Sequence, residues 1–231
     1  MRVVLKISGE SLKEEQNISN EALKKILKEI TDLKENNELI IIVGGGNFWR
    51  GRNSLNIEND TSDYIGMLAT CMNALALESF LNNNSLNAKA FSAIDIPSLI
   101  EKKEISEIEG YLKDNIIILG GGTGSPGVST DTTTVEAAIN YKADLILMSK
   151  NVDGIYDKDP KEEGAKKIDT ISHEELLNMS LNQKGDLYVM DLGALKKLIE
   201  YKIPLYLYNN NKIESIEEVL TGKKGTKVIT D

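Results

Sequence analysis

Three glycine-bearing turns, each placed directly after a short apolar run, are the feature that most constrains how this chain can fold. The turns are KISGE at 6–10, GGGN at 44–47 and GGGTG at 120–124. The runs VVLKIS, ELIIIV and NIIIL that lead into them are short and rich in Val and Ile, which predicts buried strands. Ligands of an open parallel sheet bind beyond the carboxyl ends of its strands. We therefore expect the three turns to meet at one crevice.

Strand-like and helix-like segments alternate along the whole chain. Residues 20–34 carry Leu23, Ile26 and Ile30 at helical spacing, and Ser19 or Asn20 can cap that helix. Further helices are predicted at 62–82, 131–143, 172–180, 190–202 and 213–220, and further strands at 88–93, 144–149, 204–209 and 226–230. The alternation predicts an α/β fold with a mostly parallel central sheet sandwiched by helices, in a single domain over residues 1–231.

Composition narrows the classes of function. The chain has 27 basic and 36 acidic residues and a net charge of −9, which argues against general binding to nucleic acid. Its single cysteine, Cys71, excludes an internal disulfide. No stretch is expected to span a membrane, and the apolar run near the N-terminus is too short for a signal peptide. We therefore predict a cytoplasmic protein, with Cys71 packed in the core and His173, the one histidine, exposed at a helix start.

The third turn contains G-x-G-x-x-G at Gly122, Gly124 and Gly127, the spacing of a dinucleotide-binding fingerprint. Its context is wrong for that function. The motif lies in mid-chain, Pro126 interrupts it, and the next helix is predicted to begin only near Asp131. No G-x-x-x-x-G-K-[ST] motif occurs either. We interpret the turns as phosphate clamps of another kind.

Charged and hydroxyl side chains stand beside these turns in a pattern that fits phosphoryl transfer. Lys6 and Arg50 flank the first two turns and could neutralise charge that spreads over a phosphoryl group in the transition state. Thr123, Ser129 and Thr130 border the third turn. Asp131 either caps the predicted helix or orients the reacting groups, and the residues leave both roles open.

Six segments, in this order, resemble bacterial uridylate (UMP) kinases of the amino-acid kinase superfamily over nearly the whole chain. They are KISGE, GGGNFWRG, SDYIGMLATCMNALALESFL, GGGTGSPGVSTDTTTVEAA, NVDGIYDKDP and VMDLGAL. The resemblance implies transfer of the γ-phosphoryl group of ATP to UMP, with Mg²⁺ accompanying ATP. It also implies a homohexamer, GTP as activator and UTP as inhibitor. The acceptor-binding lobe would cover about 1–150 and the ATP-binding lobe about 151–231.

The resemblance also implies a role for each matching residue. Lys6, Arg50, Asp131 and Asp191 would be catalytic. UMP would contact Gly45, Asp63, Thr123, Gly124, Ser125, Pro126, Gly127, Val128, Ser129 and Thr130. ATP would contact Lys6, Ile7, Ser8, Gly9, Gly46, Arg50, Lys150, Tyr156 and Asp159. No residue is assigned as a metal ligand.

The chain departs from the common bacterial pattern at 125–128, where Ser-Pro-Gly-Val replaces Asn-Pro-aromatic-aromatic. This leaves GTP activation and subunit packing open. Two other functions also remain: a kinase of the same superfamily acting on a small acid, and a non-enzymatic relative that stores molybdenum or tungsten or senses nucleotides. The block around Asp63 argues against the first, and the scarcity of extra ligands argues against metal storage.

Overall fold

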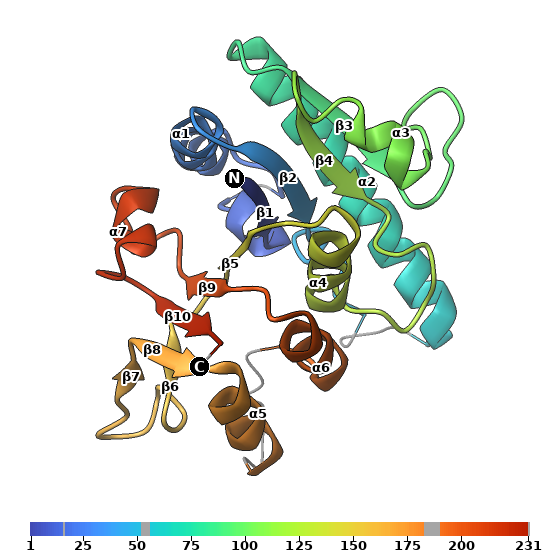
Figure 1. Ribbon diagram of the computed structural model, residues 1–231. Coiled ribbons are helices and arrows are strands. Elements are labelled where there is room, and N and C mark those ends of the chain that lie inside the picture. The colour runs from blue at the N-terminus through green and yellow to red at the C-terminus, as the bar shows by residue number, and fades with distance from the viewer. Residues whose placement is uncertain (16, 52–55, 183–189, 231) are drawn as a thin grey trace.

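The computed structural model describes residues 1–15, 17–51, 56–182 and 190–230 (Figure 1). Its centre is an eight-stranded sheet in the order β3-β4-β2-β1-β5-β9-β10-β8. The strands are β1 (Arg2–Ile7), β2 (Glu38–Val43), β3 (Ala88–Ser92), β4 (Ile116–Gly120), β5 (Leu145–Ser149), β8 (Thr170–Ser172), β9 (Leu205–Tyr208) and β10 (Thr226–Ile229). Every pairing in this sheet is parallel except that of β9 with β10. The predicted mostly parallel α/β sheet is confirmed.

Helices cover both faces of this sheet (Figure 1). One face carries α1 (Asn20–Lys34), α2 (Asn59–Asn83) and α7 (Ile216–Leu220), and the other carries α3 (Ile105–Glu109), α4 (Thr130–Asn140), α5 (His173–Asn182) and α6 (Leu192–Tyr201). Successive side chains of a strand point to opposite faces, so each strand feeds two apolar clusters. Leu5 and Ile41 belong to the α1–α2 side, and Val4 and Ile40 belong to the α4–α6 side.

Two helix starts show how local hydrogen bonds set the element boundaries. At α1, the Ser19 hydroxyl accepts a hydrogen bond from the Ala22 N–H, as one of the two predicted caps. At α4, the cap is Ser129, whose hydroxyl accepts from the Thr132 N–H. The alternative in which Asp131 caps this helix is therefore wrong. Asp131 lies in the first turn instead, where a carboxylate is favoured by the helix dipole.

The expectation that no stretch reaches the length of a membrane span is wrong for helix α2. Its 25 residues are long and apolar enough to cross a bilayer by length and composition, and it is the one such helix among the described residues. One side of α2 is buried against β3 and β4 through Cys71, Ala74 and Leu77. This side of α2 is a core element of the α/β fold. Leu68 and Met72 stay about half exposed, so that packing accounts for only part of the apolar composition of the helix.

Other elements escaped the sequence analysis because they are short. They are the 3₁₀ helix η1 (Gly9–Leu12), α3, β8, and a separate two-stranded hairpin of β6 (Ile155–Tyr156) and β7 (Lys167–Ile168). The expected exposure of His173 is wrong, since this residue is only 3% exposed and its Nε2 lies 3.1 Å from the Ile203 carbonyl oxygen. The expectation that Cys71 packs in the core is confirmed.

The strand order places the glycine turns side by side. Strands β4, β2, β1 and β5 are consecutive neighbours and run parallel, so their carboxyl ends share one edge. A buried amide pair supports this edge: Asn73 of α2 donates to the Gly44 carbonyl at 2.6 Å and exchanges hydrogen bonds with Asn47. Helix α2 is thereby tied to the second glycine turn.

Candidate functional site

Two cavities adjoin at the shared edge of the sheet. The larger, about 440 Å³, is lined by Lys6, Ser8, Gly9, Glu10, Gly44, Gly45, Gly46, Arg50, Gly51 and Thr130. The other, about 380 Å³, is lined by Gly45, Gly46, Trp49, Gly51, Ser62, Asp63, Gly66, Met67, Thr70, Gly122, Thr123, Val128, Ser129, Thr130 and Thr133. We call them the clamp cavity and the acceptor cavity. They have Gly45, Gly46, Gly51 and Thr130 in common, so groups bound in each would meet at this wall.

Glycine is required where the turns approach one another. A Cβ atom on Gly9 would lie 2.5 Å from the Gly46 backbone nitrogen, and a Cβ on Gly45 would lie 2.8 Å from the Gly66 carbonyl oxygen. Real Cβ atoms do not tolerate such distances, so a larger residue would force the turns apart. The first two turns and α2 can pack this closely only because their contact points lack side chains.

Lys6, which lines the clamp cavity, forms one charged cluster with Asp131 and Lys150, which line neither cavity. Asp131 places Oδ1 at 3.4 Å from the Lys6 Nζ and Oδ2 at 2.5 Å from the Lys150 Nζ. The Lys6 side chain is only 8% exposed. Burial lowers the pKa of Lys6, Asp131 opposes that shift, and the charge of Lys150 adds to it. The structure thus brings together three predicted residues from β1, α4 and the end of β5.

Arg50 is held by a partner that the sequence analysis missed. Its guanidinium forms an ion pair with Glu10, with Nη2 at 2.8 Å from Oε1, at the rim of the clamp cavity. The two residues flank different glycine turns, and Glu10 follows Gly9 directly in KISGE. Nothing in the sequence indicated that pairing, because it depends on how closely the first and second turns pack.

Asp63 and the third turn close the acceptor cavity. Asp63 lies near the start of α2, and its Oδ2 accepts a hydrogen bond from the Gly127 N–H at 2.7 Å. Thr123 lines the same cavity, and its Oγ1 is buried without a hydrogen-bond partner among the described residues. Of the remaining predicted UMP contacts, Gly45, Val128, Ser129 and Thr130 line the cavity, whereas Gly124, Ser125, Pro126 and Gly127 do not.

Asp191 is placed differently from Asp131. It caps α6 by accepting from the Ala194 N–H, and it also accepts from Ser129 Oγ at 2.5 Å and Thr132 Oγ1 at 2.8 Å. Burial raises the pKa of Asp191, but these hydrogen bonds to the ionised form outweigh burial and leave it lowered. Asp191 therefore fastens α6 to the start of α4, and its catalytic role stays a prediction.

The segment predicted to hold the adenine nucleoside is fixed by its own contacts. Tyr156 donates to Asp153 Oδ1 at 2.9 Å, and Lys212, from the loop after β9, pairs with Asp153 Oδ2 at 3.2 Å. Asp159 accepts from the Lys161 N–H within a turn. Tyr156 and Asp159 line neither the clamp cavity nor the acceptor cavity.

Several residues of the acceptor cavity were missed by the sequence analysis. Trp49 lines the cavity and donates from Nε1 to Ser62 Oγ at 3.0 Å. Thr70 accepts from the Gly121 N–H at 2.7 Å and so anchors the third turn to α2. The one sequence feature that could have indicated Trp49 and Thr70 is that both lie in segments already rich in predicted site residues.

A family model described as "Amino acid kinase family" matches residues 1–209. The chain belongs to the amino acid kinase family. The uridylate kinase of Limosilactobacillus reuteri is 40% identical over 242 aligned residues, covering 100% of this chain and 97% of that protein. Two solved structures are also similar to this amino acid kinase. The UMP kinase of Ureaplasma parvum has a TM-score of 0.90 at 32% identity, covering 99% of this chain and 98% of that one. The UMP kinase of Bacillus anthracis has a TM-score of 0.91 at 28% identity, covering 100% and 96%.

The pairing of Arg50 with Glu10 predicts how this amino acid kinase binds anions. Glu10→Gln frees Arg50 and should tighten binding of inorganic tripolyphosphate, measured by calorimetry at low ionic strength. The gain should stay within about fivefold, because the Arg50 side chain is 57% exposed and exposed ion pairs contribute about 1 kcal/mol or less. Glu14→Gln, which removes a carboxylate paired with Lys25, should leave the affinity unchanged. Weaker binding to Glu10→Gln would contradict the idea that Glu10 competes with phosphate.

Proposed function

We propose that this chain is a UMP kinase that transfers the γ-phosphoryl group of ATP to UMP and yields UDP and ADP. The observation that carries the proposal is the shared wall of the two cavities. A nucleotide phosphate in each cavity would meet its partner at Gly45, Gly46, Gly51 and Thr130. The names of the relatives support UMP as the acceptor, and two adjoining cavities agree with the binding of an acceptor and a donor side by side.

Each subsite has side chains suited to its part in the transfer. In the clamp cavity, backbone N–H groups of the glycine turns, Lys6, Ser8 and Arg50 would hold the ATP phosphates. Ile7 does not line this cavity and its side chain is buried in the core, so it would contact ATP only through its backbone. In the acceptor cavity, Asp63 would accept from the ribose hydroxyls of UMP. The predicted contacts from Thr123 to Thr130 would surround its base and phosphate. Lys150, Tyr156 and Asp159 would contact ATP from the end of β5 and the segment that follows.

The transfer itself requires positioning and neutralisation of charge rather than a covalent intermediate. The two nucleotides would lie end to end, so that the UMP phosphate attacks the γ-phosphorus in line with the departing ADP oxygen. Lys6 and Lys150, which share Asp131 in this structure, would turn toward the phosphoryl oxygens as negative charge spreads over them. Asp131 would keep the two ammonium groups together.

Magnesium belongs to the proposal as a companion of ATP. The described residues contain no group of three His, Cys, Asp or Glu side chains that could hold a metal ion, and Asp131 is already paired with two lysines. The ion would therefore be carried mainly by phosphate oxygens, where it neutralises charge on the transferring group. The homohexamer, GTP activation, UTP inhibition and cytoplasmic location remain further parts of this proposal.

The substrate can be tested directly. ADP production from ATP should be measured with UMP, CMP, dCMP and a panel of small carboxylic and carbamic acids. UMP should give the highest kcat/KM. A small acid as the preferred acceptor would instead assign the chain to another branch of its family. The storage or sensing alternative has no support from the named relatives, and metal analysis of the purified protein would expose any bound molybdenum or tungsten.

Lys6→Ala should lower kcat by roughly 100-fold or more, as loss of one preorganised group that stabilises transition-state charge typically does. The measurement is a coupled assay of ADP release at saturating ATP and UMP. Lys24→Ala, which removes an exposed lysine on α1, is the matched control and should retain normal turnover. Near-normal turnover of Lys6→Ala would refute the assignment.

Asp63→Ala should raise the KM for UMP by about tenfold or more, since a charged hydrogen bond contributes about 1.5–3 kcal/mol, and change the KM for ATP much less. Asp60→Ala removes an exposed carboxylate from the first turn of α2, three residues before Asp63, and serves as the control. Equal effects of Asp63→Ala on both Michaelis constants would contradict its place in the acceptor subsite.

A further inference from the structure

A carboxyl group buried on α1 has no part in the site described above. Glu29 is only 6% exposed, and it belongs to a helix whose other charged residues face solvent. The Tyr208 hydroxyl, at the end of β9, donates a hydrogen bond to Glu29 Oε1. Tyr208 is fully buried. Among the described residues, the Glu29 carboxyl has one hydroxyl partner and forms no ion pair. Such a buried carboxyl is costly to ionise, so its presence calls for an explanation.

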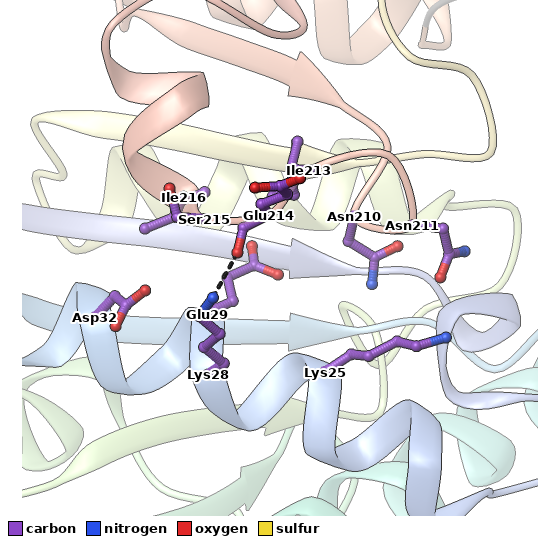
Figure 2. A pocket seen from close by; sticks show the side chains of 10 residues that line it. All are labelled: Lys25, Lys28, Glu29, Asp32, Asn210, Asn211, Ile213, Glu214, Ser215 and Ile216. Atoms are coloured by element: carbon purple, nitrogen blue, oxygen red, sulfur yellow. Dashed lines mark hydrogen bonds between the residues drawn. The ribbon is translucent and has the colours of Figure 1, made fainter.

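Glu29 is nevertheless connected to solvent. It lies in a cavity of about 190 Å³ between α1 and the loop from β9 to α7, lined also by Lys25, Lys28, Asp32, Asn210, Asn211, Ile213, Glu214, Ser215 and Ile216. Figure 2 shows Asn210 and Asn211 projecting from that loop toward α1. A proton can therefore reach the carboxyl group through this opening without unfolding of the helix.

The residue that Glu29 contacts is joined to the proposed ATP subsite by hydrogen bonds. The Tyr208 carbonyl accepts from the Lys150 N–H at 2.8 Å. The next residue, Asn209, donates from Nδ2 to the Asn151 carbonyl at 2.7 Å. Three residues further, Lys212 pairs with Asp153, which also accepts from the Tyr156 hydroxyl. These contacts hold the segment 150–156 against Tyr208 and the loop that follows it, so a shift of Tyr208 would also shift that segment.

The protonation state of Glu29 changes near neutral pH. Burial raises its pKa from 4.5 to about 7, the Tyr208 hydrogen bond acts in the opposite direction, and the charge of Asp32 adds to the rise. Because the pKa is raised on folding, folded chains keep this proton between pH 4.5 and about 7, where unfolded chains lose it. The packing around Glu29 therefore loses stability as the pH rises through that window.

The other charged groups lining the cavity do not offset the charge of Glu29 in this arrangement. Lys28 donates to the Glu214 carbonyl oxygen, as the dashed line in Figure 2 marks. Lys25 pairs with Glu14. Asp32 and the Glu214 carboxylate carry the same sign as ionised Glu29. The lysine placed to relieve an ionised Glu29 is its neighbour Lys28. If Lys28 turns to Glu29, it gives up its hydrogen bond to the Glu214 carbonyl oxygen, which ties α1 to the loop.

We propose that Glu29 is a positioning residue for ATP: when protonated it holds Tyr208 and the loop after β9 in the nucleotide-binding arrangement, and its ionisation loosens that arrangement. The proposal rests on the proposed function, because it assumes that segment 150–156 contacts ATP. Glu29 touches no substrate in this account, and it acts through Tyr208, Asn209 and Lys212.

The test is direct binding of ATP, by calorimetry with magnesium, between about pH 5.5 and 8.5. Wild-type affinity should fall by about threefold or more as the pH rises through 7. Glu29→Gln keeps the size and the acceptor for Tyr208 but cannot ionise, so its affinity should lack this fall. Asp32→Asn should shift the midpoint to lower pH, and the exposed control Glu21→Gln should behave like wild type. Titration of ATP itself is common to all four proteins and cancels in the comparison.

The same pH profile in Glu29→Gln and wild type would overturn the proposal. Should Glu29→Gln fail to fold, the profile of Asp32→Asn decides, since Asp32 is exposed and an unshifted midpoint would also overturn it. Failure of the proposed function has a different signature. Wild-type protein would then bind no ATP at any pH, or would bind ATP without producing ADP in the presence of UMP.

Discussion

The structure depends on the close approach of backbone segments at the carboxyl edge of the sheet. Gly9 meets Gly46, and Gly45 meets the backbone of α2 at Gly66, at distances that leave no room for a Cβ atom. Neighbouring parallel strands bring the turns to this edge, and Asn73 ties the second turn to α2. The two cavities share a wall because these turns touch. A bulkier residue at the contact would separate the cavities that the proposed reaction needs to keep together.

Local charge explains how an acidic chain could bind two anions. The net charge is −9, yet the site contains Lys6, Lys150 and Arg50, each paired here with a carboxylate. Asp131 and Glu10 keep these cations ordered while phosphate is absent. Phosphate would replace Glu10 as the partner of Arg50, whereas Asp131 would stay between Lys6 and Lys150 as they turn toward the phosphate. The burial of Lys6 makes this arrangement more important for it than for Arg50, which is largely exposed.

Much of the fold could be predicted because its signals are local. Apolar periodicity located α1, β2 and the strand before each glycine turn, and the turns located the cavities. The predictions that were wrong or missing concern contacts between residues far apart in the sequence, which local sequence patterns do not reveal. His173 is buried beside Ile203, which follows α6, and Thr230, which follows β10. Ser129, and not Asp131, caps α4, and Glu10 meets Arg50 only across packed turns. The burial of Glu29 likewise depends on Tyr208, a partner 179 residues away in the sequence.

The most direct test of the central claim is a crystal structure with UMP and a non-hydrolysable ATP analogue bound together. The account predicts the UMP phosphate in the acceptor cavity and the triphosphate in the clamp cavity. Their reacting groups should face each other across Gly45, Gly46 and Thr130, with Lys6 beside the γ-phosphate. Nucleotides bound at separate places, or a triphosphate that avoids the glycine turns, would contradict it.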